Sequence, residues 1–272
     1  MTKASARPND LRPFLDRFIA VCEQDDRVVA AFLGGSRGRG ESDAYSDVDL
    51  CVIAKDEAYE ALIGDRAGFV GGLGTPLFLE DFGFAALVFF ILADGTEGEL
   101  FFGSEGRLAE LEPGPTIRTL FDPRGILEGV AFAEERTDPA AQYEVLRQIL
   151  TWFWHELSHF IAAIGRGELW WAAGQLESLR GHCVNLVRIE HGAFAGEEPY
   201  EKLDRTIDPA VLSPIAETFV PMERDALLRA ARELVRFYTA RAPVIAQANE
   251  ATYPLELEEL MVKRLDDLAD SR

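Results

Sequence analysis

The sequence predicts an α+β protein, in which an N-terminal domain with a mixed β-sheet and flanking helices precedes an all-α helical bundle. Two observations carry this prediction. Apolar, β-prone runs separated by glycine-rich turns fill the first half of the chain, whereas apolar residues recur at helical spacing through the second half. The pattern changes within a stretch that contains two prolines, residues 122–140, which predicts domains of residues 1–130 and 131–272.

The first domain is expected to begin with a helix and to continue with strands joined by polar turns. The turn residues Asp94–Gly98 between two apolar runs are typical of a β-hairpin. The predicted elements are a helix that begins at Pro13, strands over residues 28–33 and 48–54 with a loop over 36–47 between them, a short helix over 56–63, hairpin strands over 86–92 and 99–102, and a strand over 117–121.

Four amphipathic stripes in the second domain predict the helices of a bundle. Pro221 precedes the third stripe and suggests a helix whose first turn contains this proline. The stripes cover residues 146–164, 169–187, 227–238 and 257–268.

The charge balance restricts the partners of the protein. The chain has 27 Lys and Arg against 47 Asp and Glu, a formal net charge of −20. A long nucleic acid or an anionic membrane surface would be repelled, whereas a small cationic ligand would be attracted. Three widely spaced cysteines form neither a metal motif nor a disulfide framework, and no signal sequence or membrane span is recognisable. We therefore expect a cytoplasmic monomer or homodimer that acts on a small molecule.

The most informative motif joins a glycine corner to a pair of aspartates. Gly34, Gly35 and Ser36 follow the first predicted strand, and Asp47 and Asp49 open the second. Glycine lets a phosphate approach the backbone closely, and Ser36 adds a hydroxyl donor. Residues two apart in a strand share a face, so the two carboxylates lie side by side and favour a divalent cation, most often Mg²⁺.

A site of this kind needs a third carboxylate on a neighbouring strand. Glu99 is the candidate, because its strand alternation directs Glu99 and Phe101 to one face and Leu100 and Phe102 to the other. Asp94 and Glu97 lie close by in the hairpin and leave the identity of the third acid open.

Gly35-Ser36, ten intervening residues and Asp47-Val48-Asp49 resemble the signature of the DNA polymerase β-like nucleotidyltransferase superfamily. The glycine-arginine run 35–40 and Ser46-Asp47-Val48-Asp49-Leu50 are similar to its minimal bacterial branch. The bundle, with residues 166–172 and the 120–122 end of the sheet, resembles nucleotidyltransferases that act on aminoglycosides or lincosamides.

The resemblance implies roles for individual residues. Asp47, Asp49 and Glu99 would bind Mg²⁺, with Glu99 as a ligand or as the base for the attacking hydroxyl. The nucleotide-binding residues would be Gly35, Ser36, Arg37, Arg39 and Ser46, with an arginine stabilising the departing pyrophosphate. The reaction would be transfer of a nucleoside monophosphate, AMP from ATP, to a hydroxyl of a small cationic antibiotic-like acceptor. Among residues of the bundle, Glu168 and Trp171 are candidates for contacting this acceptor.

Two alternatives have their own motifs or logic. His155-Glu156-Leu157-Ser158-His159 fits the H-E-x-x-H pattern of zinc hydrolases, with histidines at i and i+4 on the polar side of the helix. No third histidine follows at the spacing of the metzincin pattern, so a polar helix face explains these residues as well. A non-catalytic or antitoxin-like nucleotide-binding protein that acts on a protein partner is the other alternative.

Overall fold

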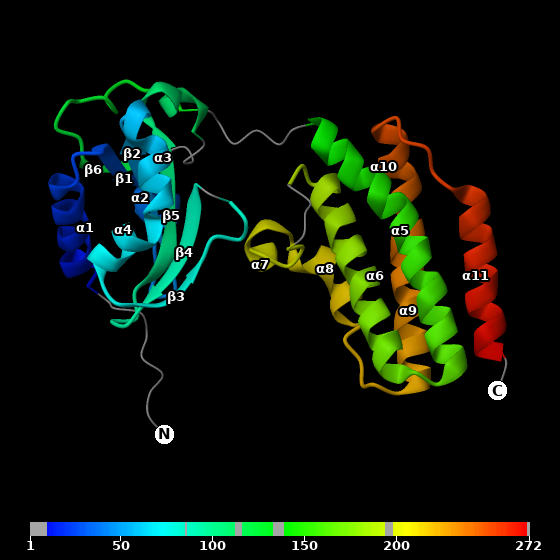
Figure 1. The fold of residues 1–272 in the computed structure, drawn as a ribbon. Helices are drawn as coiled ribbons and strands as arrows, with labels where there is room; N and C mark the ends of the chain where they lie inside the picture. Colours follow the sequence, from blue (N-terminus) through cyan, green and yellow to red (C-terminus); the bar gives the residue numbers. More distant parts are fainter. Residues whose placement is uncertain (1–9, 85, 112–115, 133–138, 194–197, 271–272) are drawn as a thin grey trace. The chain divides into compact units, whose positions relative to one another are not determined.

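The computed structural model describes residues 10–84, 86–111, 116–132, 139–193 and 198–270 (Figure 1). The chain forms two compact units, Met1–Arg136 and Thr137–Arg272. The first contains a mixed β-sheet with helices and the second is helical, which confirms the predicted fold class. The predicted boundary, between residues 130 and 131, lies shortly before this division.

The first unit is built on a six-stranded sheet with the order β3-β4-β5-β2-β1-β6. Strands β2 and β5 pair in parallel, and the other neighbouring strands pair antiparallel. The strands are β1 (Val28–Leu33), β2 (Val48–Ala54), β3 (Pro76–Glu80), β4 (Leu87–Leu92), β5 (Glu97–Ser104) and β6 (Arg118–Phe121).

The two faces of this sheet have different coverings. Helices α1 (Arg12–Gln24), α3 (Tyr59–Gly64) and α4 (Arg66–Leu73) pack their apolar side chains on one face, where even-numbered residues of β2 and β5 are buried. On the other face, a smaller cluster joins β1 and β2 to Leu108 and Leu127. This second face is only partly covered, and that leaves room for a site on it.

The glycine-rich segment between β1 and β2 differs from the expected loop. It begins with a short helix, α2 (Gly35–Arg39), which ends at Gly40 in the left-handed conformation. The 3₁₀ turn Asp56–Ala58 precedes α3, so the predicted helix over residues 56–63 is two consecutive pieces. Helix α4 and strand β3 were not expected; β3 is an edge strand with largely exposed residues and lacks a buried alternation.

Over residues 139–193 and 198–270, the second unit contains the four predicted long helices and three shorter ones. Helix α5 contacts α6 and α11, and α6 contacts α9. Two details of the prediction were wrong. Pro221 was expected in the first turn of the third long helix, but α9 begins at Arg224, because Glu223 is still extended. The apolar stripe was expected to include Leu257 and Leu260, but these two are exposed, whereas Met261 and Leu265 are buried. The helices are α5 (Pro139–Arg166), α6 (Leu169–Glu190), α7 (Leu203–Thr206), α8 (Pro209–Ala216), α9 (Arg224–Thr239), α10 (Ala242–Ala248) and α11 (Leu255–Asp270).

The three cysteines, Cys22, Cys51 and Cys183, are buried free thiols. Within the described ranges, no helix combines the length and the apolar character that a membrane crossing requires.

Candidate functional site

The topology of the sheet brings three distant parts of the chain to the same edge. Because β1 runs antiparallel to β2, its last residue, Leu33, pairs with Leu50 near the start of β2. Because β5 runs parallel to β2, it also starts at this edge, where Asp49 lies opposite Glu99. The glycine corner that follows β1, the first residues of β2 and the first residues of β5 therefore meet there.

Asp49 and Glu99 project from the same face of the sheet, since side chains of paired residues on adjacent strands share a face. Leu50 and Leu100 point to the opposite face and are buried against the helices. Phe101 follows Glu99 on the site face and is partly exposed. The alternation predicted for both strands is confirmed, and it separates the acids from the main core.

The three predicted acids influence each other electrostatically. Partial burial raises the pKa of Glu99, and the carboxylates of Asp49 and Asp47 raise it further. Each of the three side chains is only partly accessible to solvent. Asp94, one of the other candidates for the third acid, instead forms an ion pair with Arg17 at 2.6 Å. The arrangement concentrates negative charge, which a cation or a proton must compensate.

The acids are near one another without forming a tight cage. In the described part of the chain, one group of three or more His, Cys, Asp or Glu has ligand atoms that all lie within 4.8 Å of one another. This group consists of His155, Glu156 and His159. The ligand atoms of Asp47, Asp49 and Glu99 do not all lie within this distance of one another.

Gly35 places the glycine corner directly against Asp49. Its φ is +53°, and a Cβ built on it would lie 1.7 Å from Asp49 Oδ2. The amide of Gly34 donates a hydrogen bond to the backbone oxygen of Asp49 at 2.9 Å. Only glycine fits at position 35, because both the backbone conformation and the space exclude a side chain.

Arg37 holds the segment that carries Asp47. Its Nε donates to the backbone oxygen of Asp47 at 2.6 Å, and Nη2 donates to the backbone oxygen of Ser46 at 2.5 Å. These contacts give Arg37 a positioning role that sequence reasoning missed. Contacts of a long side chain with a backbone ten residues away leave no signal in sequence spacing.

The other predicted nucleotide-binding residues have local partners. Arg39 Nε donates to Glu41 at 2.9 Å. The Ser46 hydroxyl accepts from the amide of Asp43 at 2.9 Å and donates to its carboxylate at 3.1 Å. Ser36 lies in the first turn of α2 and is partly exposed. The turn before β2 is thus ordered by its own polar groups.

A second glycine fixes the position of Glu99. A Cβ on Gly98 would lie 2.3 Å from the backbone oxygen of Val48, so β5 can approach β2 at this point only because residue 98 has no side chain. Because Glu99 is the next residue, this close approach of the two strands fixes the position of the Glu99 backbone on the site face.

A cavity of about 460 Å³ opens on the site face. Gly35, Asp49 and Glu99 contribute polar and backbone groups to its wall, and Glu110 adds a further carboxylate. The apolar side chains of the wall are those of Phe32, Cys51, Leu87, Phe101 and Leu111. Leu50 also borders the cavity, although its side chain is buried on the opposite face. Strand alternation identified Phe101, whereas Leu87 and Leu111 come from segments whose approach depends on the tertiary fold.

The second unit has its own pocket, of about 830 Å³, between residues of α5, α6 and the segment 198–201. Four glutamates and two aromatic residues take part in its lining: Glu156, Glu177, Glu198, Glu201, Trp152 and Tyr200. The predicted acceptor residues lie elsewhere. Glu168 is exposed in the turn before α6, and Trp171 packs beside His159 and Arg166.

Residues 15–104 match the model of the nucleotidyltransferase domain family. The match spans β1, α2, β2 and β5, and therefore contains Gly35, Ser36, Asp47, Asp49 and Glu99. The sheet-containing unit carries a nucleotidyltransferase domain, and the resemblance predicted from the glycine corner and the paired aspartates is confirmed.

Among solved structures, the chain is similar to an aminoglycoside 6-adenyltransferase from Bacillus subtilis, with 12% identity, a TM-score of 0.45, and coverage of 95% of this chain and 98% of that one. It is also similar to a nucleotidyltransferase-like protein from Exiguobacterium sibiricum, with 14% identity, a TM-score of 0.37, and coverage of 87% and 76%. A comparison with curated protein sequences gives no significant match.

The contact between Gly35 and Asp49 leads to a stability prediction. Gly35→Ala is expected to lower the free energy of unfolding of the first unit by about 2 kcal/mol or more, because left-handed strain adds to overlap with the Asp49 carboxylate. Hydrogen exchange of the β2 amides measures this loss. Gly40→Ala is the matched control, since φ is +76° there but no atom lies within 4 Å of its Cβ, so about 1 kcal/mol of strain is expected. Equal stability of the two variants would contradict the close packing.

The raised pKa of Glu99 predicts a pH-dependent stability. Folding favours the protonated form of Glu99. The resulting contribution to the free energy of unfolding is fully present below the unfolded pKa of about 4.3, and it is lost as the pH rises through the higher pKa of the folded state. Metal-free Glu99→Gln is therefore expected to melt at a higher temperature than the natural protein at pH 7, with the difference vanishing near pH 4. Glu60→Gln, which removes an exposed carboxylate from α3, serves as the control in calorimetric melts. A lower melting temperature of Glu99→Gln at pH 7 would refute the assigned electrostatics.

Proposed function

We propose that the protein transfers a nucleoside monophosphate, AMP from ATP, to a hydroxyl of a small cationic acceptor and releases pyrophosphate. The observation that carries the proposal is the opposition of Asp49 and Glu99 on parallel strands, beside the Gly35 corner and in one cavity. This arrangement lies within the segment that matches the nucleotidyltransferase domain. A nucleoside triphosphate is a polyphosphate, so its binding requires both acids that hold a cation and a glycine corner that the phosphates can approach closely.

The residues of the site fit a divalent metal ion. Their donor atoms are carboxylate oxygens, which Mg²⁺ prefers, and the pKa of Glu99 is raised by burial and then by the neighbouring carboxylates of Asp49 and Asp47, which shows that negative charge is concentrated here. Asp47, Asp49 and Glu99 would hold the ion. When bound, Mg²⁺ neutralises charge on the phosphates and on the departing pyrophosphate.

Residues around the glycine corner orient the triphosphate in this proposal. The backbone of Gly35 and the hydroxyl of Ser36 lie at the edge of the sheet beside Asp49 and are suited to bind phosphate oxygens. Arg37 acts indirectly, because its guanidinium holds the Ser46 and Asp47 carbonyls and thereby fixes the aspartate. The apolar wall around Phe101 is suited to pack against the nucleoside.

The transfer step forms one bond and breaks one. The acceptor oxygen attacks the α-phosphorus of the nucleoside triphosphate in line, and the bond from this phosphorus to the bridging oxygen of pyrophosphate breaks. In this proposal Glu99 serves either as a ligand of the ion or as the base that accepts the proton of the attacking hydroxyl. Alignment of the two oxygens and charge compensation supply most of the catalysis.

The acceptor is proposed to carry ammonium groups. Support comes from the net charge of −20 and from the glutamate-rich pocket of the second unit, where Trp152 and Tyr200 provide flat apolar surfaces. Carboxylates bind ammonium groups through charge-assisted hydrogen bonds, and aromatic faces attract cations. Aminoglycosides combine such ammonium groups with sugar hydroxyls, which makes them the first acceptor class to examine.

Pyrophosphate release tests the reaction. The purified protein is incubated with Mg²⁺ and each of the four nucleoside triphosphates, together with panels of aminoglycosides, lincosamides and simple sugars. Pyrophosphate is expected to be released only when a suitable acceptor is present. Asp49→Asn is expected to reduce the rate at least about 100-fold, because it removes a charge that compensates the metal ion. Glu60→Gln is expected to retain the natural rate. Acceptor-dependent turnover that survives Asp49→Asn would exclude the assigned site.

A kinetic comparison tests the acceptor pocket. Glu198→Gln is expected to raise KM for a cationic acceptor about tenfold, the equivalent of about 1.4 kcal/mol for one charge-assisted contact, with little change in kcat. Glu168→Gln examines the acidic residue singled out from the sequence. Glu259→Gln in α11 is the control, because this exposed glutamate lies outside the pocket. Unchanged KM in both Glu198→Gln and Glu168→Gln would remove the support for these two contacts.

A further inference from the structure

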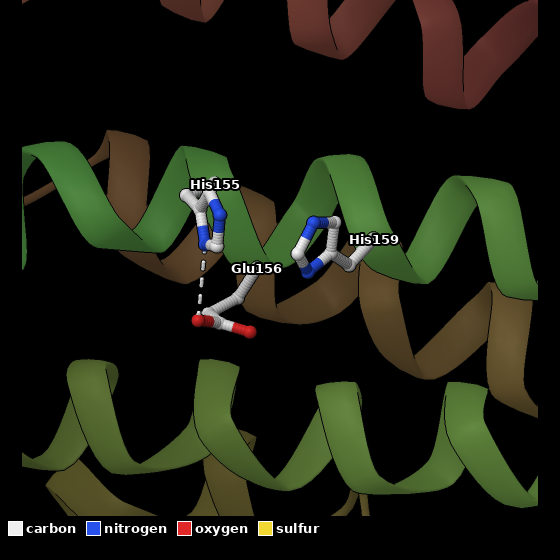
Figure 2. A group of neighbouring side chains, drawn as sticks. All are labelled: His155, Glu156 and His159. Carbon is white, nitrogen blue, oxygen red and sulfur yellow. Dashed lines mark hydrogen bonds and ion pairs between the residues drawn. The ribbon is translucent and has the colours of Figure 1, made fainter.

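The polar side of α5 carries a cluster of two histidines and a glutamate that lies apart from the acids of the first unit. Figure 2 shows the imidazoles of His155 and His159 and the carboxylate of Glu156 gathered beside this helix. One nitrogen of each histidine and one carboxylate oxygen all lie within 4.8 Å of one another. His155 Nδ1 is 3.2 Å from Glu156 Oε1, and the two imidazole rings are 4.3 Å apart between centroids.

We propose that His155, Glu156 and His159 bind one transition-metal ion of the Zn²⁺ type. Two imidazole nitrogens and a carboxylate oxygen form a donor set that suits Zn²⁺ and disfavours Mg²⁺. Donor atoms around a tetrahedral Zn²⁺ ion are separated by about 3.4 Å, given bond lengths of about 2.1 Å. The observed group, within 4.8 Å, would have to close by about 1.4 Å at most to reach this separation.

Surrounding groups already orient the proposed ligands. With the Gln175 amide turned so that both its groups find partners, its nitrogen donates to Glu156 Oε2 and its oxygen accepts from Trp171 Nε1 at 3.2 Å. This contact with α6 leaves Oε1 of Glu156 beside His155. Hydrogen bonds to the second oxygen of a ligating carboxylate are typical of metal sites, because they fix the direction of the ligand.

Aromatic neighbours restrict the two imidazoles. His155 lies against Trp152 at 4.9 Å between ring centroids, and His159 lies against Trp171 at 5.7 Å. The four rings therefore form a continuous row along α5 and onto α6. Such packing reduces the rotational freedom that the histidines lose on binding an ion, and it places two indoles where a bound metal alters their fluorescence.

The arrangement favours metal binding over the hydrolase chemistry that the H-E-x-x-H pattern first indicated. In that chemistry the glutamate is a base and a further ligand follows downstream. Here the Glu156 carboxylate lies among the histidine nitrogens and is held by Gln175, as a third ligand would be. The site belongs to the second unit and shares no residue with the acids of the first unit, although Glu156 also lines the glutamate-rich pocket proposed for the acceptor.

Calorimetric titration with Zn²⁺ tests the proposal, performed on the full chain with Asp49→Asn and excess Mg²⁺ so that the acids of the first unit do not contribute. One equivalent of Zn²⁺ is expected to bind. His155→Ala and His159→Ala are each expected to weaken binding at least tenfold, and Gln175→Ala about tenfold through the loss of ligand orientation. His191→Ala is the control, because this exposed histidine follows the last residue of α6 and stands outside the cluster.

Spectroscopy separates a built site from casual binding by surface histidines. Co²⁺ added to the same protein is expected to give ligand-field absorption bands and to quench tryptophan emission, and both effects are expected to disappear in the His155→Ala and His159→Ala double variant. Circular dichroism verifies that this variant remains helical. Zn²⁺ binding with unchanged stoichiometry and affinity in the folded double variant, or no uptake by the unsubstituted cluster, would overturn the proposal. Either result leaves the nucleotidyltransferase assignment intact.

Discussion

The parallel pairing of β2 with β5 is the constraint on which the site depends. It sets Asp49 opposite Glu99, and it brings the start of both strands to the edge where β1 ends at the glycine corner. Like charges on neighbouring strands destabilise a sheet. The fold retains this pair and stabilises the sheet through the apolar residues that alternate with it, of which Leu50 and Leu100 are buried on the opposite face.

Small residues and backbone contacts maintain this geometry around the acids. Gly98 allows β5 to approach the Val48 carbonyl, and Gly35 allows the corner to lie against Asp49. Arg37 binds two carbonyls in the segment before β2. Each contact restricts a backbone that carries an acid. The site is preorganised by its supporting residues, which is how a phosphoryl-transfer site gains most of its rate.

The helical unit carries a strip of polar side chains on α5 beside its apolar core. Phe153 and Leu157 of α5 are fully buried, while His155, Glu156 and His159 lie on the adjoining polar side. Glu156 takes part both in the cluster with the histidines and in the wall of the glutamate-rich pocket. An ion at the cluster would therefore change the charge at one end of this pocket.

The sequence by itself determined the fold class, the main strands and the long helices. These features follow from local periodicity, and a spacing of two or of three to four residues is visible in any single chain. It also indicated Glu99 and Phe101 as one face of a strand. It did not reveal that Arg37 binds the Asp47 carbonyl, or that Leu257 and Leu260 are exposed on α11.

Only the tertiary structure decided which of the nearby acids joins the site. Asp94 pairs with Arg17, a residue 77 positions earlier, whereas Glu99 faces Asp49 through the register of a parallel pair. Register between distant strands depends on the summed packing of both faces and on the close approach at Gly98. The gathering of Glu156 with Gln175 likewise required the contact of α5 with α6. Long-range contacts of this kind have no local spacing from which they could be predicted.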